Sequence, residues 1–150
     1  MSRAECDLGL VGLGVMGRNL ALNFTDHGFK VAVYNRTPDK TRDFVAGAGA
    51  DRPLYPTYSP AELLESLRPP RAVLIMVSAG PAVDAVLSEL TPLLNRGDVV
   101  IEGGNSHFAD TDRRARTLAD AGLLFLGLGV SGGELGARYG PSLMPGGSRE

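Results

Sequence analysis

The chain has 150 residues, 43% of them hydrophobic and 21% charged, which suits one domain with a buried core and argues against disorder. The net charge of −2 argues against general nucleic-acid binding, and no apolar run approaches the roughly 20 residues that cross a bilayer. The single cysteine, Cys6, excludes an intramolecular disulfide and provides no zinc site, and no signal-peptide pattern opens the chain, so we expect a cytoplasmic protein without a metal.

Short apolar runs alternate with longer amphipathic stretches along most of the chain. The runs predict strands at residues 7–13, 29–34, 72–77, 98–102 and 123–128. The amphipathic stretches predict helices at residues 15–27, 39–46, 60–67, 81–94 and 106–121, the third of them capped by Ser59. This alternation indicates an α/β fold, doubly wound around a mainly parallel sheet.

The last part of the chain has a different composition. Residues 129–150 contain seven glycines and two prolines and show neither a helical nor a strand period, which predicts a long functional loop. We therefore divide the chain into a domain at residues 1–128 and a loop segment at 129–150. Because no closing element follows, we expect the segment to lead into a further domain.

A glycine-rich turn lies between the first predicted strand and the first predicted helix. It has the form G-x-G-x-x-G, in which the glycines allow a tight turn, a close approach of the backbone to a pyrophosphate, and helix-strand packing. In this position it predicts a Rossmann-type dinucleotide site formed by Gly12, Leu13, Gly14, Val15, Met16 and Gly17.

The end of the second predicted strand indicates which dinucleotide binds. NAD enzymes place a carboxylate there for the ribose 2′-OH, whereas this chain has Asn35, Arg36 and Thr37, with no carboxylate before Asp39. A guanidinium can pair with a 2′-phosphate and stack on adenine, so we predict NADP rather than NAD. The alternative is that Arg36 is a solvated turn residue.

Two further segments are candidates for substrate binding. Asn105 follows a predicted strand, where ligands collect in parallel sheets, and its amide can both donate and accept hydrogen bonds. Its alternative role is to cap the following helix, a role that Ser106 could equally fill. In the glycine-rich segment, successive N–H groups and the Ser131 hydroxyl could bind an anion such as a carboxylate.

Several of these segments together resemble the N-terminal coenzyme domain of the 6-phosphogluconate dehydrogenase (decarboxylating) family. The similarity covers the whole chain and is carried by residues 12–23, 26–29, 35–37, 103–106 and, most specifically, 129–147. It implies oxidation of 6-phosphogluconate to ribulose 5-phosphate, CO₂ and NADPH in the pentose phosphate pathway, by a homodimer in which a C-terminal helical domain follows the coenzyme domain.

The resemblance also implies roles for individual residues. It assigns to the coenzyme the glycine-rich turn, Asn35 to Thr37, and the residues Val77, Ser78, Ala79 and Asn105. It assigns to the substrate the residues Asn105, Ser131, Gly132 and Gly133. The chain departs from the family pattern at Ser78, where a lysine is usual, and at Glu102, where an aspartate is common.

The catalytic groups of the family are a lysine and a glutamate in the later helical domain. Neither Lys30 nor Lys40 matches that lysine motif, and His27 and His107 fit capping or surface roles better. We therefore expect these 150 residues to bind NADP without turning over 6-phosphogluconate alone. The alternatives are a free-standing NADP-binding module and a related dehydrogenase or reductase acting on another β-hydroxyacid or an imine.

Overall fold

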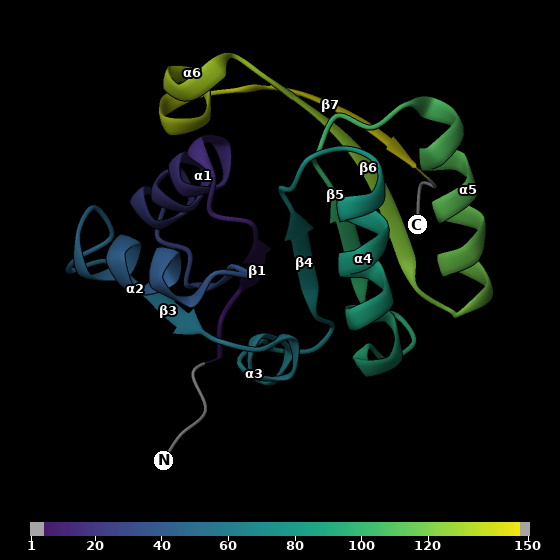
Figure 1. Ribbon diagram of the computed structural model, residues 1–150, viewed down its shortest axis with the longest axis horizontal. Helices are drawn as coiled ribbons and strands as arrows, with labels where there is room; N and C mark the ends of the chain where they lie inside the picture. Colours follow the sequence, from purple (N-terminus) through teal and green to yellow (C-terminus); the bar gives the residue numbers. More distant parts are fainter. Residues whose placement is uncertain (1–4, 148–150) are drawn as a thin grey trace.

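A seven-stranded sheet organises the computed structural model, which describes residues 5–147 (Figure 1). The strand order is β3-β2-β1-β4-β5-β6-β7, and only β7 runs antiparallel to its neighbour. The strands are β1 (Leu8–Val11), β2 (Val31–Tyr34), β3 (Leu54–Thr57), β4 (Ala72–Ile75), β5 (Val99–Glu102), β6 (Leu124–Ser131) and β7 (Ser142–Gly147). The predicted α/β, mainly parallel architecture is confirmed.

Helices cover both faces of the sheet, as expected of a doubly wound fold. They are α1 (Val15–Asp26), α2 (Pro38–Ala46), α3 (Pro60–Glu65), α4 (Pro81–Leu90), α5 (Phe108–Asp120) and α6 (Gly133–Tyr139), with a 3₁₀ turn at Thr91–Leu93. In Figure 1, α1 and α2 lie at the left, α4 and α5 at the right, and α6 at the top beside α1. No helix within residues 5–147 is long and apolar enough to cross a membrane.

Two hydrophobic cores lie on the two faces of the sheet. Successive residues of the central strands point to opposite faces, so Leu10 joins one core and Val11 the other. The core around Leu10 includes residues of α1, α2 and α6, and the core around Val11 includes residues of α3, α4 and α5. Both faces are thus buried, which explains the continuously apolar strands.

Most predicted element boundaries differ from the observed ones by a few residues, and two expectations are wrong. β3 was not expected, because Pro56 interrupts its short apolar run; as an edge strand, it tolerates a proline. The predicted loop at residues 129–150 is regular structure as far as residue 147: β6 extends to Ser131, α6 follows, and β7 pairs back along β6. The last three residues of that prediction lie outside the described part of the chain. Gly129 accommodates a close neighbour in β7, since a Cβ at that position would lie 3.1 Å from Cε of Met144.

Helix α6 is fixed to α1 by a polar cluster. Asp26, at the end of α1, forms ion pairs with Arg138 of α6 and with Arg52, and Nδ2 of Asn23 donates a hydrogen bond to the carbonyl oxygen of Ala137 at 3.1 Å. The hydrogen bonds from the two arginines lower the pKa of Asp26 below its usual value of 3.8. Ala137 is fully buried in the core beneath. These contacts determine where the β6–α6 turn lies.

We expect Asp26→Asn to loosen α6, because the neutral amide cannot form ion pairs with the two arginines. Hydrogen–deuterium exchange of Gly133–Tyr139 should become faster than in the wild type, while Asp39→Asn, which removes only an exposed pair with Arg42, should leave it unchanged. Since the folded-state pKa is lowered, the stabilisation is complete above pH 3.8 and is lost as the pH falls through the folded-state value. Equal exchange in both variants would contradict this role.

Candidate functional site

Three loops meet at the carboxyl ends of β1, β4 and β5. The backbone N–H of Met76 donates to the carbonyl oxygen of Val11 at 2.8 Å, and that of Gly103 donates to Ile75 at 2.9 Å, so the loops begin at one level. The chain passes from β1 outward to β3 and returns to β4 on the other side of β1, so the strand order reverses at this point. In open α/β sheets such a switch point is where ligands bind.

The glycine-rich turn after β1 has the geometry that its sequence predicts. Gly12 has φ +101°, and a Cβ there would lie 2.3 Å from the carbonyl oxygen of Met76. A Cβ at Gly17 would lie 1.9 Å from the carbonyl oxygen of Gly12, so only glycine lets α1 approach β1 this closely. A Cβ at Gly14 would meet no atom within 4 Å, which leaves open space in front of the backbone.

The first turn of α1 provides backbone donors that have no partner among residues 5–147, beside that open space. The N-cap is Gly14, which has no side chain that could cap the helix, and the first turn contains no acidic residue. The first bond of the helix joins the N–H of Arg18 to the carbonyl oxygen of Gly14. The N–H groups before it and the positive end of the helix dipole therefore favour an anionic ligand such as a phosphate.

Asn35 connects the glycine-rich turn to the end of β2. Its side-chain oxygen accepts a hydrogen bond from the backbone N–H of Leu13 at 2.9 Å, and its Nδ2 donates to the carbonyl oxygen of Thr37 at 3.4 Å. Asn35 was predicted to contact the coenzyme, but its side-chain oxygen is engaged within the protein. The side-chain amide of Asn35 therefore fixes the glycine-rich turn relative to Arg36 and Thr37.

Arg36 and Thr37 extend into solvent at the carboxyl end of β2. Arg36 forms no salt bridge with any residue that the structure describes, and its charge lies near Tyr34. Burial raises the pKa of Tyr34, with a smaller contribution from Glu89, and the charge of Arg36 opposes both. The guanidinium is therefore available to an anion at the edge of the crevice.

A cavity of about 320 Å³ lies at the switch point and is lined by residues of all three loops. It contains six of the predicted site residues, Gly14, Val15, Met16, Gly17, Val77 and Asn105. Ser78 and Ala79 are exposed beside Val77 and do not line it. The remaining lining residues were not predicted from the sequence; they are Met76, Gly103, Gly104 and Val130.

Asn105 lies between this cavity and a second one of about 250 Å³. Its backbone has φ +60°, a left-handed conformation that asparagine tolerates better than most residues. Neither Asn105 nor Ser106 caps α5; the N-cap is His107, whose Nδ1 accepts a hydrogen bond from Ala109 N–H at 3.3 Å. The capping alternative for Asn105 is therefore wrong, and its side chain can contact ligands in both cavities.

Glu102 supports the turn that carries Asn105. Its carboxylate is buried, and Oε1 accepts a hydrogen bond from the backbone N–H of Gly104 at 2.7 Å. A Cβ at Gly104 would lie 2.5 Å from the carbonyl oxygen of Val77, so the β4 and β5 loops are in direct contact here. Sequence reasoning noted Glu102 only as a departure from the family pattern and missed this contact.

Ser131, Gly132 and Gly133 form the exposed turn between β6 and α6. Gly132 and Gly133 have φ +126° and +62°, so the backbone of this turn favours glycine at both positions. None of the three lines either cavity, although the preceding residue, Val130, lines the first. The structure thus places this turn next to the switch-point cavity rather than in it.

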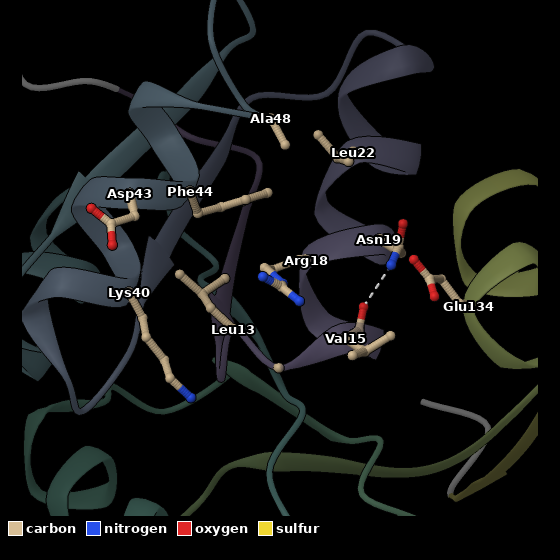
Figure 2. A pocket seen from close by; sticks show the side chains of 11 residues that line it. Leu13, Val15, Arg18, Asn19, Leu22, Lys40, Asp43, Phe44, Ala48 and Glu134 are labelled. Carbon is tan, nitrogen blue, oxygen red and sulfur yellow. Dashed lines mark hydrogen bonds between the residues drawn. The ribbon is translucent and has the colours of Figure 1, made fainter.

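A further cavity of about 550 Å³ separates α1 from α2 (Figure 2). Gly14 and Val15 line this cavity as well as the one at the switch point, so the two adjoin at the first turn of α1. Figure 2 shows that Arg18 and Lys40 line it from α1 and α2, while Glu134 of α6 points toward Asn19. Lys40 was considered from the sequence only as a catalytic lysine, and neither Lys40 nor Glu134 was predicted to line a cavity.

Cys6 takes no part in the site. It is fully buried at the amino end of the sheet, opposite the crevice, and burial raises the pKa of its thiol to about 11. The thiolate is the reactive form of cysteine, so this side chain behaves as a core residue.

The fold and the crevice define a dinucleotide-binding α/β domain. Residues 7–150 match the family model described as the NAD binding domain of 6-phosphogluconate dehydrogenase, and the chain belongs to that family. It is 53% identical over 150 residues to a Saccharomyces cerevisiae decarboxylating 6-phosphogluconate dehydrogenase, covering 100% of this chain and 30% of that protein. The chain therefore spans about a third of the length of the curated relatives that it matches.

Solved structures agree with this assignment. Plasmodium falciparum 6-phosphogluconate dehydrogenase, described in its apo form and in complex with NADP⁺ and with 6-phosphogluconate, has a TM-score of 0.90 at 43% identity, covering 96% of this chain and 31% of that one. A Mycobacterium tuberculosis 3-hydroxyisobutyrate dehydrogenase has a TM-score of 0.83 at 21% identity, covering 97% of this chain and 47% of that one. The second similarity shows the fold alone.

Proposed function

We propose that this chain binds NADP(H) across the switch-point crevice. The observation that carries the proposal is the uncapped first turn of α1, which faces open space at Gly14 where a pyrophosphate can approach the backbone. The exposed Arg36 at the end of β2, unpaired within residues 5–147, supplies the charge that a 2′-phosphate requires. The described P. falciparum relative, whose cofactor is NADP⁺, supports the same choice.

We further propose that the chain is the coenzyme part of a decarboxylating 6-phosphogluconate dehydrogenase. NADP⁺, when bound, would supply the hydride acceptor for the oxidation of the C3 alcohol of 6-phosphogluconate, in which the hydroxyl proton passes to a base outside this chain before CO₂ is lost. Asn105, between the two cavities, would hold substrate and coenzyme together, with Ser131, Gly132 and Gly133 completing the substrate side. Ser78 would contact the coenzyme by hydrogen bonding alone, because it lacks the charge of the usual lysine.

Residues outside this chain would supply the proton transfers. Among residues 5–147 we identify no lysine or glutamate with a catalytic role, and the relatives are about three times as long. Helix α6 and β7 expose apolar side chains where the helical domain of the family would dock, among them Leu135, Tyr139, Leu143 and Met144. Three expectations from the sequence stay predictions: that the whole protein is a homodimer, that it is cytoplasmic, and that the chain divides at residue 128.

Fluorescence titration of the 150-residue chain with NADPH and with NADH tests the coenzyme proposal. We expect saturable NADPH binding and at least roughly tenfold weaker NADH binding, since one charge-assisted contact to a phosphate contributes about 1.5–3 kcal/mol. Equal affinities would contradict the assignment to NADP. The same preparation should form no NADPH from NADP⁺ and 6-phosphogluconate; if it does, catalysis needs no further domain.

A free-standing NADP-binding module is the alternative of a different class. It would bind NADPH equally well, so the titration does not separate the two functions. Binding of 6-phosphogluconate does, because a module without a substrate would not recognise it. Saturation by 6-phosphogluconate in the presence of NADPH, monitored by the amide resonance of Asn105, would support the dehydrogenase.

A further inference from the structure

Arg114 is a buried arginine whose guanidinium joins three elements behind the site. It lies on α5, and its side chain is 2% exposed. Its Nε donates a hydrogen bond to Oδ1 of Asp84 on α4 at 2.9 Å, and Nη1 donates to Oγ of Ser106 at 2.9 Å. Its Nη2 donates to the carbonyl oxygen of Gly80 at 3.2 Å and to Oδ2 of Asp84 at 3.3 Å.

Two of these partners belong to the loops that line the switch-point cavity. Gly80 ends the β4 loop that contains Val77, and Ser106 directly follows Asn105 in the β5 loop. Neither Arg114 nor Asp84 lines either of the two cavities that Asn105 lines. The guanidinium thus holds both loops from behind without reaching the space that a ligand would occupy.

The left-handed backbone of Asn105 is held on both sides. Before it, the buried Glu102 carboxylate accepts the Gly104 N–H at 2.7 Å, and after it, Ser106 receives the hydrogen bond from Arg114. Glu102 also contributes to the raised pKa of Arg114, behind the larger effect of Asp84, so the two charges lie in one electrostatic environment. A strained residue persists only where its surroundings determine it, and here the determinants are these two contacts.

We propose that Arg114 is a positioning residue that sets the separation between the β4 loop and Asn105. Through this separation it determines the affinity with which both loops bind the coenzyme. The inference rests on the proposed NADP site. This role needs a planar guanidinium, because its N–H groups point in fixed directions and donate to Asp84, Ser106 and Gly80 at the same time. A lysine at this position would keep the charge but could not reach the three partners in that geometry.

The test compares Arg114→Lys with Arg113→Lys in the 150-residue chain. Arg113 is a matched control, because it lies on the same helix and also pairs with Asp84, yet its side chain is 56% exposed. We expect Arg114→Lys to weaken NADPH binding roughly tenfold, at the lower end of what orienting residues behind a metal site contribute to affinity. We also expect it to shift the side-chain amide resonance of Asn105 in the free protein, whereas Arg113→Lys should leave both unchanged.

A purely structural role for Arg114 makes a different prediction. It would lower the melting temperature of Arg114→Lys but, below that temperature, would leave the NADPH affinity and the Asn105 resonance as in the wild type; that result would overturn the proposal. Ser106→Ala removes one hydrogen bond and keeps the Asp84 pair, so it replaces Arg114→Lys if that variant does not fold. An unchanged Asn105 resonance in Ser106→Ala would likewise overturn it.

The two proposals fail separately. If the wild type does not bind NADPH, the proposed function is wrong, and the comparison of Asn105 resonances in the free proteins still tests the positioning role. If the wild type binds NADPH and Arg114→Lys binds it equally well, the positioning role is wrong and the proposed function stands.

Discussion

Gly17→Ala is expected to destabilise the fold by about 3 kcal/mol, at the upper end of what overpacking costs. The added methyl group would lie 1.9 Å from the carbonyl oxygen of Gly12 and 3.0 Å from its carbonyl carbon, and neither backbone atom can move without displacing the turn. On helix propensity alone the substitution would stabilise α1 by about 1 kcal/mol. A loss of stability in urea denaturation therefore identifies the close contact between α1 and the turn after β1.

Gly14→Ala is the matched control and should behave in the opposite way. A Cβ at Gly14 meets no atom within 4 Å, and its φ of −72° is open to alanine, so we expect a stability change of about 1 kcal/mol or less. NADPH binding should nevertheless be lost, because the methyl group fills the space where a pyrophosphate must approach. Unimpaired NADPH binding by Gly14→Ala, or unimpaired stability of Gly17→Ala, would contradict the roles assigned to these glycines.

Arg36→Asp is expected to reduce the affinity for NADPH about 100-fold, or roughly 2.7 kcal/mol, and to change the affinity for NADH little. The substitution replaces the one proposed partner of the 2′-phosphate by a charge that repels it, whereas NADH has no phosphate there. Titration of both coenzymes measures the change in preference. Unchanged NADPH affinity would show that Arg36 is a solvated turn residue.

Arg68→Asp controls for the change in net charge. Arg68 is an exposed side chain paired with Asp7 near the amino end of β1. The crevice lies at the other end of the strands. The substitution Arg68→Asp makes the same change in net charge as Arg36→Asp, so an effect of net charge alone on NADPH affinity would appear in both variants. We expect its NADPH affinity to stay within about twofold of the wild type, because charges at that distance are screened by salt.

Sequence reasoning predicted the parts of the fold and site that depend on local chemistry. The glycine-rich turn was identified because backbone conformation, close approach and helix start all constrain residues 12–17. Ser59 was identified as a cap, and its hydroxyl accepts the N–H of Glu62 at 3.1 Å. In each case the determining interactions lie within a few residues along the chain.

The features that escaped prediction depend on pairing between distant segments. Gly129 breaks the strand pattern of β6 when the sequence is read alone, and the register with β7, which places Gly129 opposite Met144, makes it part of the sheet. Arg114 appeared in the sequence as one of several arginines on a polar helix. Its burial follows from partners on α4 and in two loops, contributed by residues 8 to 34 positions away.

The left-handed backbone of Asn105 has a consequence for the kinetics and entropy of binding. Because folding already imposes this conformation, no conformational entropy of that backbone is lost when a ligand arrives. The residue need not reorganise after an encounter, so it adds no slow isomerisation to association, and differences in affinity among ligands that contact it should reside mainly in their dissociation rates.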